Sequence, residues 1–207
     1  MSLTVYGAPL SPFVRKLCLC LIEKGLDYEL EVVMPFGQPD WFRELNPLGR
    51  IPAFRDGDLK LADSSVICQY LEERYPEHMQ LYGDGAEQRA KVRWLEKYAD
   101  YELAPLTTFT VFRNRILKPT SGQPCNEEAV QTAMQQKLPP HFDYLEQQLG
   151  DVAHASTEVE RARRRVHAAL DGVATKFAPL ATLEESRAAS LRGRLPRLLR
   201  SAQTMFS

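Results

Sequence analysis

The sequence predicts an α/β domain followed by an all-α domain, and three observations support this fold class. A strand, a helix and a second strand follow one another in the first 33 residues, two short strands and a helix follow between residues 51 and 75, and only helical periodicity continues after residue 87. The first domain therefore has the order β-α-β, then β-β-α. We assign residues 1–77 to it, residues 78–86 to a turn-rich linker and residues 87–207 to the helical domain.

The β-α-β unit is predicted from residue types and periodicity. Residues 3–6 are a short run with β-branched and aromatic residues that stops at a Gly-Ala-Pro turn. Residues 27–33 alternate between apolar and polar residues and then become apolar, which predicts a second strand. Between them, Pro12 opens an amphipathic helix that Gly25 ends. Its expected core stripe is Val14, Leu17, Cys18 and Leu21, and its expected water-facing residues are Arg15, Lys16, Glu23 and Lys24.

The β-β-α unit is predicted from turn and cap signals. A short helix is expected over residues 39–45. Its proline at position 39 suits a helix start, and the helix ends at residue 45 because the residue before Pro47 is pushed out of the helical region. Residues 51–54 and 59–61 are predicted strands, joined by the hairpin turn Asp56-Gly57-Asp58. Asp63 is expected to cap a helix that ends at Tyr75-Pro76 and has its apolar positions at Val66, Ile67, Tyr70 and Leu71.

Three motifs of this domain together resemble one known family. They are the segment from Tyr6 to Lys16 around Ser11-Pro12-Phe13, the segment Asn46-Pro47-Leu48-Gly49-Arg50-Ile51-Pro52, and the segment Leu61-Ala62-Asp63-Ser64-Ser65. This set resembles the thioredoxin-like N-terminal domain of a cytosolic-type, bacterial glutathione S-transferase with a serine at the thiol-activating position. The resemblance is close over residues 1–80 and looser to residue 149. It implies a glutathione transferase fold, glutathione as cosubstrate, a homodimer and a detoxification role.

Ser11, at the predicted start of the first helix, is the candidate catalytic residue. Glutathione reacts as a thiolate, whereas an unperturbed thiol has a pKa of about 8.5. Lowering that pKa by about two units requires about 2.7 kcal/mol of preferential thiolate binding, which a hydroxyl donor and a helix N-terminus can supply together. The resemblance implies this activating role for Ser11, with conjugation or peroxide reduction as the chemistry. A helix cap alone is the alternative.

Two further points of the sequence are predicted to bind glutathione. An acidic residue with backbone N–H groups at a helix start suits an amino acid head group, and the resemblance assigns Asp63 and Ser64 to the γ-glutamyl end. The resemblance also implies a cis bond between Ile51 and Pro52, with Ile51 pairing to the cysteinyl part. For Asp63, capping alone is again the alternative.

Arg50 and Gln38 are candidate binding residues on the resemblance. The family places groups near the glycine carboxylate of glutathione at these positions. A surface position for Arg50 and loop filling for Gln38 are the alternative interpretations.

The four cysteines do not predict a metal site. Cys18 and Cys20 are two residues apart on a predicted helix, about 200° around its axis, so they cannot share one ion. The sequence has no Cys-x-x-Cys pair and no histidine cluster, so no zinc is expected.

No apolar run approaches about 18 residues and no secretory leader is recognisable, so we expect a cytoplasmic protein with reduced thiols and no membrane partner. The formal charge of −1 gives no reason to expect nucleic acid binding.

The second domain is predicted to begin with a long amphipathic helix. Its recurring apolar and aromatic positions are Val92, Trp94, Leu95, Tyr98, Ala99 and Leu103. The resemblance implies that this helix builds a homodimer interface and part of the pocket for a small electrophilic cosubstrate. Candidate lining residues are Asp100, Phe109 and Phe112, and for the two phenylalanines core or interface packing is the alternative. A loop over residues 119–124, a cap at Asn126 and a break or kink at Pro139-Pro140 are also expected.

Residues 151–207 are atypical for the family. They contain no Trp and no Tyr, and they carry ten basic against six acidic residues, with a run of basic side chains over residues 161–165. Three interpretations are open: a solvated basic face, a surface for nucleic acid or another anion, and a shifted reading frame or altered terminus. Intact mass compared with the gene would test the third.

The motifs favour an enzyme, a glutathione transferase that stabilises the thiolate at Ser11 and conjugates it to a small hydrophobic electrophile. The alternative class is a non-catalytic regulatory protein similar to the stringent-starvation relatives, which keep this fold and bind RNA polymerase. The three motifs around Ser11, Ile51-Pro52 and Asp63-Ser64 favour the enzyme, because a protein that is only a scaffold has no physical need for three glutathione-binding points. A glutathione-dependent isomerase of the maleylacetoacetate type is a lesser alternative, since those relatives have a Ser-Cys-rich opening that Leu10-Ser11-Pro12-Phe13 does not match.

Overall fold

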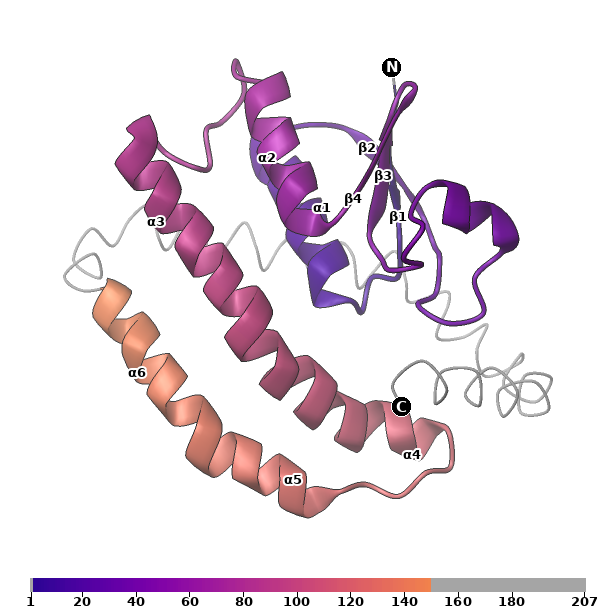
Figure 1. Cartoon of the computed structure of the whole chain (residues 1–207), viewed down its shortest axis with the longest axis vertical. Coiled ribbons are helices and arrows are strands. Elements are labelled where there is room, and N and C mark those ends of the chain that lie inside the picture. The colour runs from indigo at the N-terminus through magenta and orange to yellow at the C-terminus, as the bar shows by residue number, and fades with distance from the viewer. Residues whose placement is uncertain (1, 150–207) are drawn as a thin grey trace. The chain divides into compact units, whose positions relative to one another are not determined.

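A computed structural model of the chain describes residues 2–149, which belong to two compact units. Among these residues, the first unit ends at Arg89 and the second begins at Ala90. Figure 1 shows that the first unit combines strands and helices and that the second is made of long helices. The predictions made for residues 150–207, the basic segment included, lie outside the described residues.

The first unit is built on a four-stranded mixed sheet with the strand order β2-β1-β3-β4. Its strands are β1 (Leu3–Tyr6), β2 (Tyr28–Glu31), β3 (Ala53–Asp56) and β4 (Leu59–Ala62). β1 is parallel to β2 and antiparallel to β3, and β3 is antiparallel to β4. The β-α-β and β-β-α halves predicted from the sequence are therefore confirmed, and the pairing of β1 with β3 joins them.

Two helices of this unit, α1 (Pro12–Lys24) and α2 (Ser64–Arg74), pack against each other on one side of the sheet (Figure 1). α1 follows its predicted cap Ser11 and ends at Gly25, which adopts the left-handed conformation that glycine favours, with φ 67°. Fully buried side chains of this unit include Val5, Val14, Leu17, Leu21, Phe54, Ile67 and Leu71. Burying one side chain of this size contributes about 1.5–3 kcal/mol, so the apolar stripe of α1 holds the helix in place.

Three side chains of these helices lie where periodicity does not place them. Lys24, predicted to face water, is buried because it forms an ion pair with Glu72. Val66, predicted on the apolar face of α2, is 50% exposed. Val66 is one residue from the buried Ile67, and the rotation of about 100° per residue around the helix axis directs its side chain outward. Cys20 is buried, so α1 buries a wider face than its predicted stripe.

The loop between β2 and β3 carries the short helix predicted there, η1 (Asp40–Glu44), which is a 3₁₀ helix. Phe42 anchors it in an apolar cluster with Tyr6, Val33 and Ala53. β3 begins at Ala53, two residues later than the sequence predicts. Pro52 has no N–H group to give to a neighbouring strand, which accounts for the later start.

The second unit consists of two long helical stretches joined by a loop (Figure 1). The first runs through α3 (Gly85–Tyr98), whose residues up to Arg89 belong to the first unit, and then through η2 (Ala99–Leu103), η3 (Pro105–Leu117) and α4 (Lys118–Thr120). η2 and η3 have π-helical turns. The second runs through α5 (Glu127–Thr132), η4 (Ala133–Lys137) and α6 (Leu138–Leu149). α5 contacts η3 and α6 contacts η2, so the two stretches are antiparallel. The helical character predicted for the second domain is confirmed over the described residues.

The second stretch bears on two sequence predictions. Asn126 caps α5 as predicted, because its Oδ1 accepts a hydrogen bond from the Ala129 N–H at 3.0 Å. Pro139 and Pro140 do not break the helix: they lie in the first turn of α6, directly after the π-helical turn of η4. The change from π-helical to α-helical turns falls where these prolines leave N–H donors missing.

None of the helices in residues 2–149 combines the length and apolarity that crossing a bilayer requires. The same residues contain no group of three or more His, Cys, Asp or Glu side chains placed to hold a metal ion. All four cysteines are free thiols: Cys18, Cys20 and Cys68 are buried, and Cys125 is exposed.

Candidate functional site

Strand register brings the three sequence motifs to one end of the sheet. Tyr6, the last residue of β1, pairs with Ala53, the first residue of β3, and Ala53 pairs with Ala62, the last residue of β4. Each of these three residues adjoins one motif: the loop before α1, the Ile51-Pro52 pair and the start of α2. Motifs that are up to about fifty residues apart in sequence therefore converge at this end of the sheet.

The first two motifs are in direct contact around Gly7. A Cβ atom added to Gly7 would lie 2.5 Å from Val14 Cγ2 and 3.4 Å from Ile51 Cβ. Only a residue without a side chain fits at this position, because the chain approaches both the first turn of α1 and Ile51. The peptide bond between Ile51 and Pro52 is cis, as the resemblance implies.

Ser11 lies at the start of α1 and caps it. Its Oγ accepts a hydrogen bond from the Val14 N–H at 3.5 Å, and its side chain is half-buried. This contact uses an acceptor lone pair of the hydroxyl, so the hydroxyl proton can be donated to a ligand. The first turn of α1 contains no acidic side chain, so no carboxylate there opposes the attraction of the helix N-terminus for an anion. Ser11 is thus both a cap and a candidate donor.

Asp63 caps α2 from an unusual backbone conformation. Its Oδ1 accepts hydrogen bonds from the N–H groups of Ser65 at 2.9 Å and Val66 at 3.2 Å. Among the described residues it is the one non-glycine residue with a positive φ, 74°. The Asp63 side chain is exposed, and the following Ser64 is buried. Residues held in such conformations cluster at ligand sites, which adds an independent reason to consider Asp63 a binding residue.

One side-chain contact joins the starts of α1 and α2. Lys16 Nζ donates a hydrogen bond to Ser65 Oγ at 3.0 Å, and Ser65 is buried. Helical periodicity predicts only that Lys16 faces water, and its partner is 49 residues further along the chain, so no local signal reveals the pair. The bond fixes the relative position of the two helix starts that carry Ser11 and Asp63.

Gln38 and Arg50 lie beside the turn that precedes Ile51. A Cβ atom added to Gly49 would lie 3.0 Å from Gln38 Oε1, so the Gln38 side chain packs on this turn. Gln38 Nε2 is buried and has no hydrogen-bond partner among the described residues. Arg50 is exposed, and its carbonyl oxygen accepts a hydrogen bond from Asn46. Both residues are therefore on the Ile51 side of the site, where the buried N–H donor of Gln38 has no partner among the described residues.

The cysteine closest in sequence to Ser11 is not placed to act as a nucleophile. Burial raises the pKa of the Cys18 thiol, and a hydrogen bond with Tyr28 lowers it by less. A buried thiol with a raised pKa is a poor nucleophile, because the thiolate is the reactive form. Cys18 therefore gives no support for thiol–disulfide exchange.

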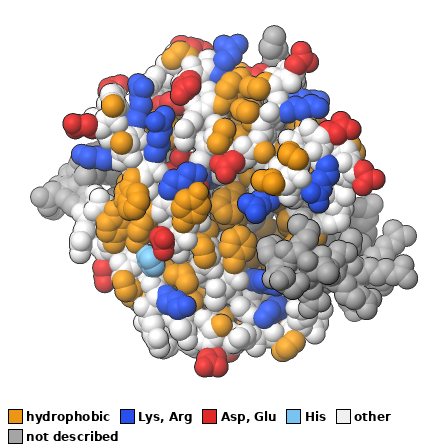
Figure 2. Space-filling model, viewed as in Figure 1, with side chains coloured by type: hydrophobic (Ala, Val, Ile, Leu, Met, Phe, Trp, Pro, Cys, Tyr) orange, Lys and Arg blue, Asp and Glu red, His pale blue; other side chains and the backbone are white. Residues whose placement is uncertain are grey.

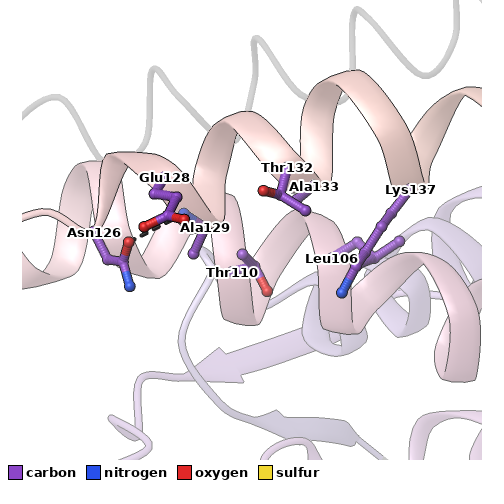
Figure 3. A pocket seen from close by; sticks show the side chains of 8 residues that line it. All are labelled: Leu106, Thr110, Asn126, Glu128, Ala129, Thr132, Ala133 and Lys137. Atoms are coloured by element: carbon purple, nitrogen blue, oxygen red, sulfur yellow. Dashed lines mark hydrogen bonds between the residues drawn. The ribbon is translucent and has the colours of Figure 1, made fainter.

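The second unit contains a pocket of about 360 Å³ between its two helical stretches (Figure 3). Its lining residues are Leu106, Thr110, Asn126, Glu128, Ala129, Thr132, Ala133 and Lys137. Figure 3 shows the Lys137 side chain extending from its helix toward the one that carries Leu106 and Thr110. Two of the polar lining groups are already engaged within the protein, because Thr110 Oγ1 donates to the Pro105 carbonyl and Asn126 Oδ1 caps α5.

The residues that the sequence suggests for the electrophile pocket are not among those lining this cavity. Phe109 is 52% exposed and Phe112 is half-buried. Asp100 is half-buried and forms an ion pair with Lys97 at 3.9 Å. These three residues stay predictions for an electrophile pocket.

Comparison with known proteins decides the family. Residues 5–79 match the family model described as glutathione S-transferase, N-terminal domain. The glutathione S-transferase PARB of Nicotiana tabacum is 33% identical over 156 residues, which cover 73% of this chain and 72% of that protein. This chain belongs to the glutathione S-transferase family. A second relative in this family, glutathione S-transferase F7 of Arabidopsis thaliana, is 30% identical over 163 residues, or 76% of each protein.

Solved structures of glutathione transferases show the same fold. Glutathione transferase F7 of Populus trichocarpa superposes with a TM-score of 0.63 and 26% identity, over 72% of this chain and 71% of that one. The thioredoxin-like N-terminal domain and the helical region that follows are thereby confirmed, as is the assignment to an enzyme family. The three relatives named here are plant proteins, so the bacterial type implied by the resemblance stays a prediction.

Proposed function

We propose that this transferase binds glutathione at the end of the sheet described above, stabilises its thiolate with Ser11 and conjugates the sulfur to a small hydrophobic electrophile. The observation that carries the proposal is the register of Tyr6, Ala53 and Ala62, which places all three motifs at one end of one sheet. A ligand of tripeptide length can contact all three motifs there at once.

The chemistry rests on the position of the Ser11 hydroxyl. Its Oγ is engaged as an acceptor by Val14, which leaves the hydroxyl proton for the sulfur of glutathione. The N-terminus of α1 adds a partial positive charge, and no acidic side chain stands in its first turn. Together these groups favour the thiolate over the thiol, and the thiol proton leaves to water. The thiolate then attacks the electrophile and forms a carbon–sulfur bond, while the electrophile either releases a leaving group or takes up a proton from water. With a peroxide, the sulfur attacks one oxygen, the O–O bond breaks, and the other oxygen leaves as an alcohol or water after protonation, so that a sulfenic acid of glutathione is formed.

The remaining anchors orient the tripeptide. The Asp63 carboxylate is exposed at the start of α2 and faces the ammonium group of the γ-glutamyl end, while Ser64 and the helix N-terminus receive its carboxylate. The main chain of Ile51 pairs with the cysteinyl residue. The buried Nε2 of Gln38, which has no partner among the described residues, and the exposed Arg50 receive the glycine carboxylate.

We also propose that the active protein is a homodimer, the assembly typical of the family. Four large apolar side chains on the first helical stretch are exposed at intervals of seven or eight residues, Trp94, Tyr101, Phe109 and Ile116, and Leu117 is exposed beside the last of them. This spacing is typical of one side of a helix, and such a stripe is more stable when covered. Among the coloured side chains of Figure 2, Lys and Arg are interspersed with Asp and Glu.

Titration calorimetry of the full chain with glutathione and with S-methylglutathione tests the proposal. We expect both to bind, because the anchors do not require a free thiol, and only glutathione to produce the ultraviolet absorbance of a thiolate. A panel of electrophiles and peroxides, assayed with and without glutathione, then identifies the cosubstrate class. Absence of binding at millimolar glutathione would refute the proposal and would favour the regulatory alternative, in which the fold is kept without the ligand.

A further inference from the structure

The turn between η1 and β3 is closed by one buried side chain, Asn46, which is 3% exposed. Its Oδ1 accepts a hydrogen bond from the Leu48 N–H at 3.0 Å, and its Nδ2 donates one to the Arg50 carbonyl at 2.7 Å. The Asn46 carbonyl also accepts a bond from the Gly49 N–H at 2.9 Å. One residue therefore fixes both the entry and the exit of the turn that delivers the chain to Ile51.

Side chains of the preceding loop hold the same turn from outside. Arg43 Nη1 donates to the Pro47 carbonyl at 2.9 Å. Gly49 has φ 61°, and a Cβ atom added to it would lie 3.0 Å from both Arg43 Cζ and Gln38 Oε1. A side chain at this position would press on Arg43 and Gln38, and glycine is the residue that suits this conformation.

We propose that Asn46 is a positioning residue for glutathione binding: it sets the turn so that the Ile51 main chain and the Gln38 amide face the ligand together. The inference rests on the proposed function and extends it to a residue that does not touch the ligand. Of the short side chains, only asparagine carries an N–H donor and a carbonyl acceptor at once, which the two bonds to Arg50 and Leu48 require. Without these bonds, the Arg50 carbonyl and the Leu48 N–H lose their partners within the protein, and the turn relaxes as water takes the place of Asn46.

The expected effect is on affinity and not on thiolate formation. Asn46 acts through the turn before Ile51, whereas the sulfur is stabilised from Ser11 on another segment of the chain. A displaced turn weakens the pairing of the tripeptide main chain, whereas the Ser11 hydroxyl keeps its own contact with the Val14 N–H within α1. We therefore expect a higher dissociation constant together with an unaltered pKa of the bound thiol.

The test uses two variants of the full chain and one matched control. Asn46→Asp keeps the acceptor for Leu48 and loses the donor for Arg50, and Asn46→Ala loses both. The control is Tyr70→Phe, which removes a side-chain hydrogen bond of 2.8 Å to Asp56 in the same unit. Asp56 pairs with Leu3, at the opposite end of the sheet from Ala53 and the site.

Glutathione dissociation constants, thermal unfolding midpoints and the pH dependence of the bound thiolate absorbance are measured for all four proteins. We expect both Asn46 variants to bind about tenfold or more weakly, with the pKa of the bound thiol unchanged, and Tyr70→Phe to bind within about twofold of wild type despite a lower midpoint. Affinity equal to wild type in Asn46→Asp, or an equal loss in Tyr70→Phe, would overturn the positioning role alone. A wild type that does not bind glutathione removes the proposed function, and this role with it.

Discussion

Lys24 and Glu72 form a buried ion pair, with 2.8 Å between Nζ and Oε2 and a fully buried lysine side chain. Lys24 Nζ also donates to the Met79 carbonyl at 2.9 Å, and Glu72 Oε1 accepts hydrogen bonds from the N–H groups of Leu81 and Tyr82. The pair therefore joins the end of α1, the last part of α2 and the segment that follows α2. This polar network holds the two helices that carry the site at the ends remote from it.

Lys24→Met is expected to lower the free energy of unfolding by about 3 kcal/mol, because it leaves a buried carboxylate without its ammonium partner. Urea unfolding followed by circular dichroism measures the loss. The double variant Lys24→Met with Glu72→Gln should lose less than the two single variants added together, since it leaves no unpaired charge. A loss below about 1 kcal/mol in Lys24→Met would show that the pair is not a stabilising contact.

The same pair predicts how stability depends on pH. Burial alone would raise the pKa of the Glu72 carboxyl, but hydrogen bonds from Lys24, Tyr82 and Leu81 outweigh it and lower the pKa below its ordinary value of 4.5. The folded protein therefore holds the charged form at pH values where the unfolded chain takes up a proton. The contribution is complete above about pH 4.5 and is lost as the pH falls through the folded-state pKa.

Glu72→Gln removes this titration. Its unfolding free energy should be lower than that of wild type at neutral pH, and the difference should shrink as the pH falls below about 4.5. Unfolding curves at several pH values compare the two proteins. Two curves that stay parallel over that range would contradict the assigned shift.

Features set by neighbouring residues could be predicted from the sequence, and features set by distant partners could not. The caps Ser11, Asp63 and Asn126 and the terminator Gly25 are local signals, and the structure confirms each as a helix boundary. Periodicity predicts that Lys24 faces water, because its partner is 48 residues away and the helical pattern contains no information about it. A lysine side chain normally extends its ammonium group to water, but a buried carboxylate can bind that group inside the protein instead.

The candidate site divides in the same way. Its three motifs could be found in the sequence, because each carries its own turn or cap signal. The pairing of Tyr6 with Ala53 and of Ala53 with Ala62, which brings the motifs together, follows from a strand order that the sequence pattern leaves open. Asn46 gave no separate signal either, since an asparagine before a proline is an ordinary helix end until its two bonds across the turn are seen.

Ser11→Ala is expected to separate thiolate formation from binding. The variant keeps Ile51, Asp63 and the α1 N-terminus, so glutathione should still bind, but the pKa of the bound thiol should return toward about 8.5. Loss of the cap contact with Val14 should also cost about 1 kcal/mol of stability. Ser11→Thr, which retains a hydroxyl, is the control and should keep most of the thiolate absorbance. An unchanged thiolate absorbance in Ser11→Ala would refute the assigned role.

Phe109→Glu is expected to dissociate the proposed homodimer, because it puts a charge into the exposed stripe of Trp94, Tyr101, Phe109 and Ile116. Sedimentation equilibrium measures the association of both proteins. Thr107→Glu is the matched control: Thr107 is exposed on the same helix, two residues from Phe109 and therefore on another side of it. If wild type is a monomer, or if the two variants dissociate equally, the stripe is not the interface.

Asp63→Asn is expected to separate the charge of Asp63 from its role as a cap. An asparagine side chain can still accept from the Ser65 and Val66 N–H groups, and it tolerates a positive φ, so the helix start should be preserved. Without the negative charge, the ammonium group of the γ-glutamyl end loses its partner, and glutathione should bind about tenfold more weakly. Asp63→Ala should lose both functions, with a further destabilisation of about 1–2 kcal/mol from the missing cap. Equal affinity of Asp63→Asn and wild type in calorimetry would mean that Asp63 only caps α2, because the cap is then the one function the two side chains share.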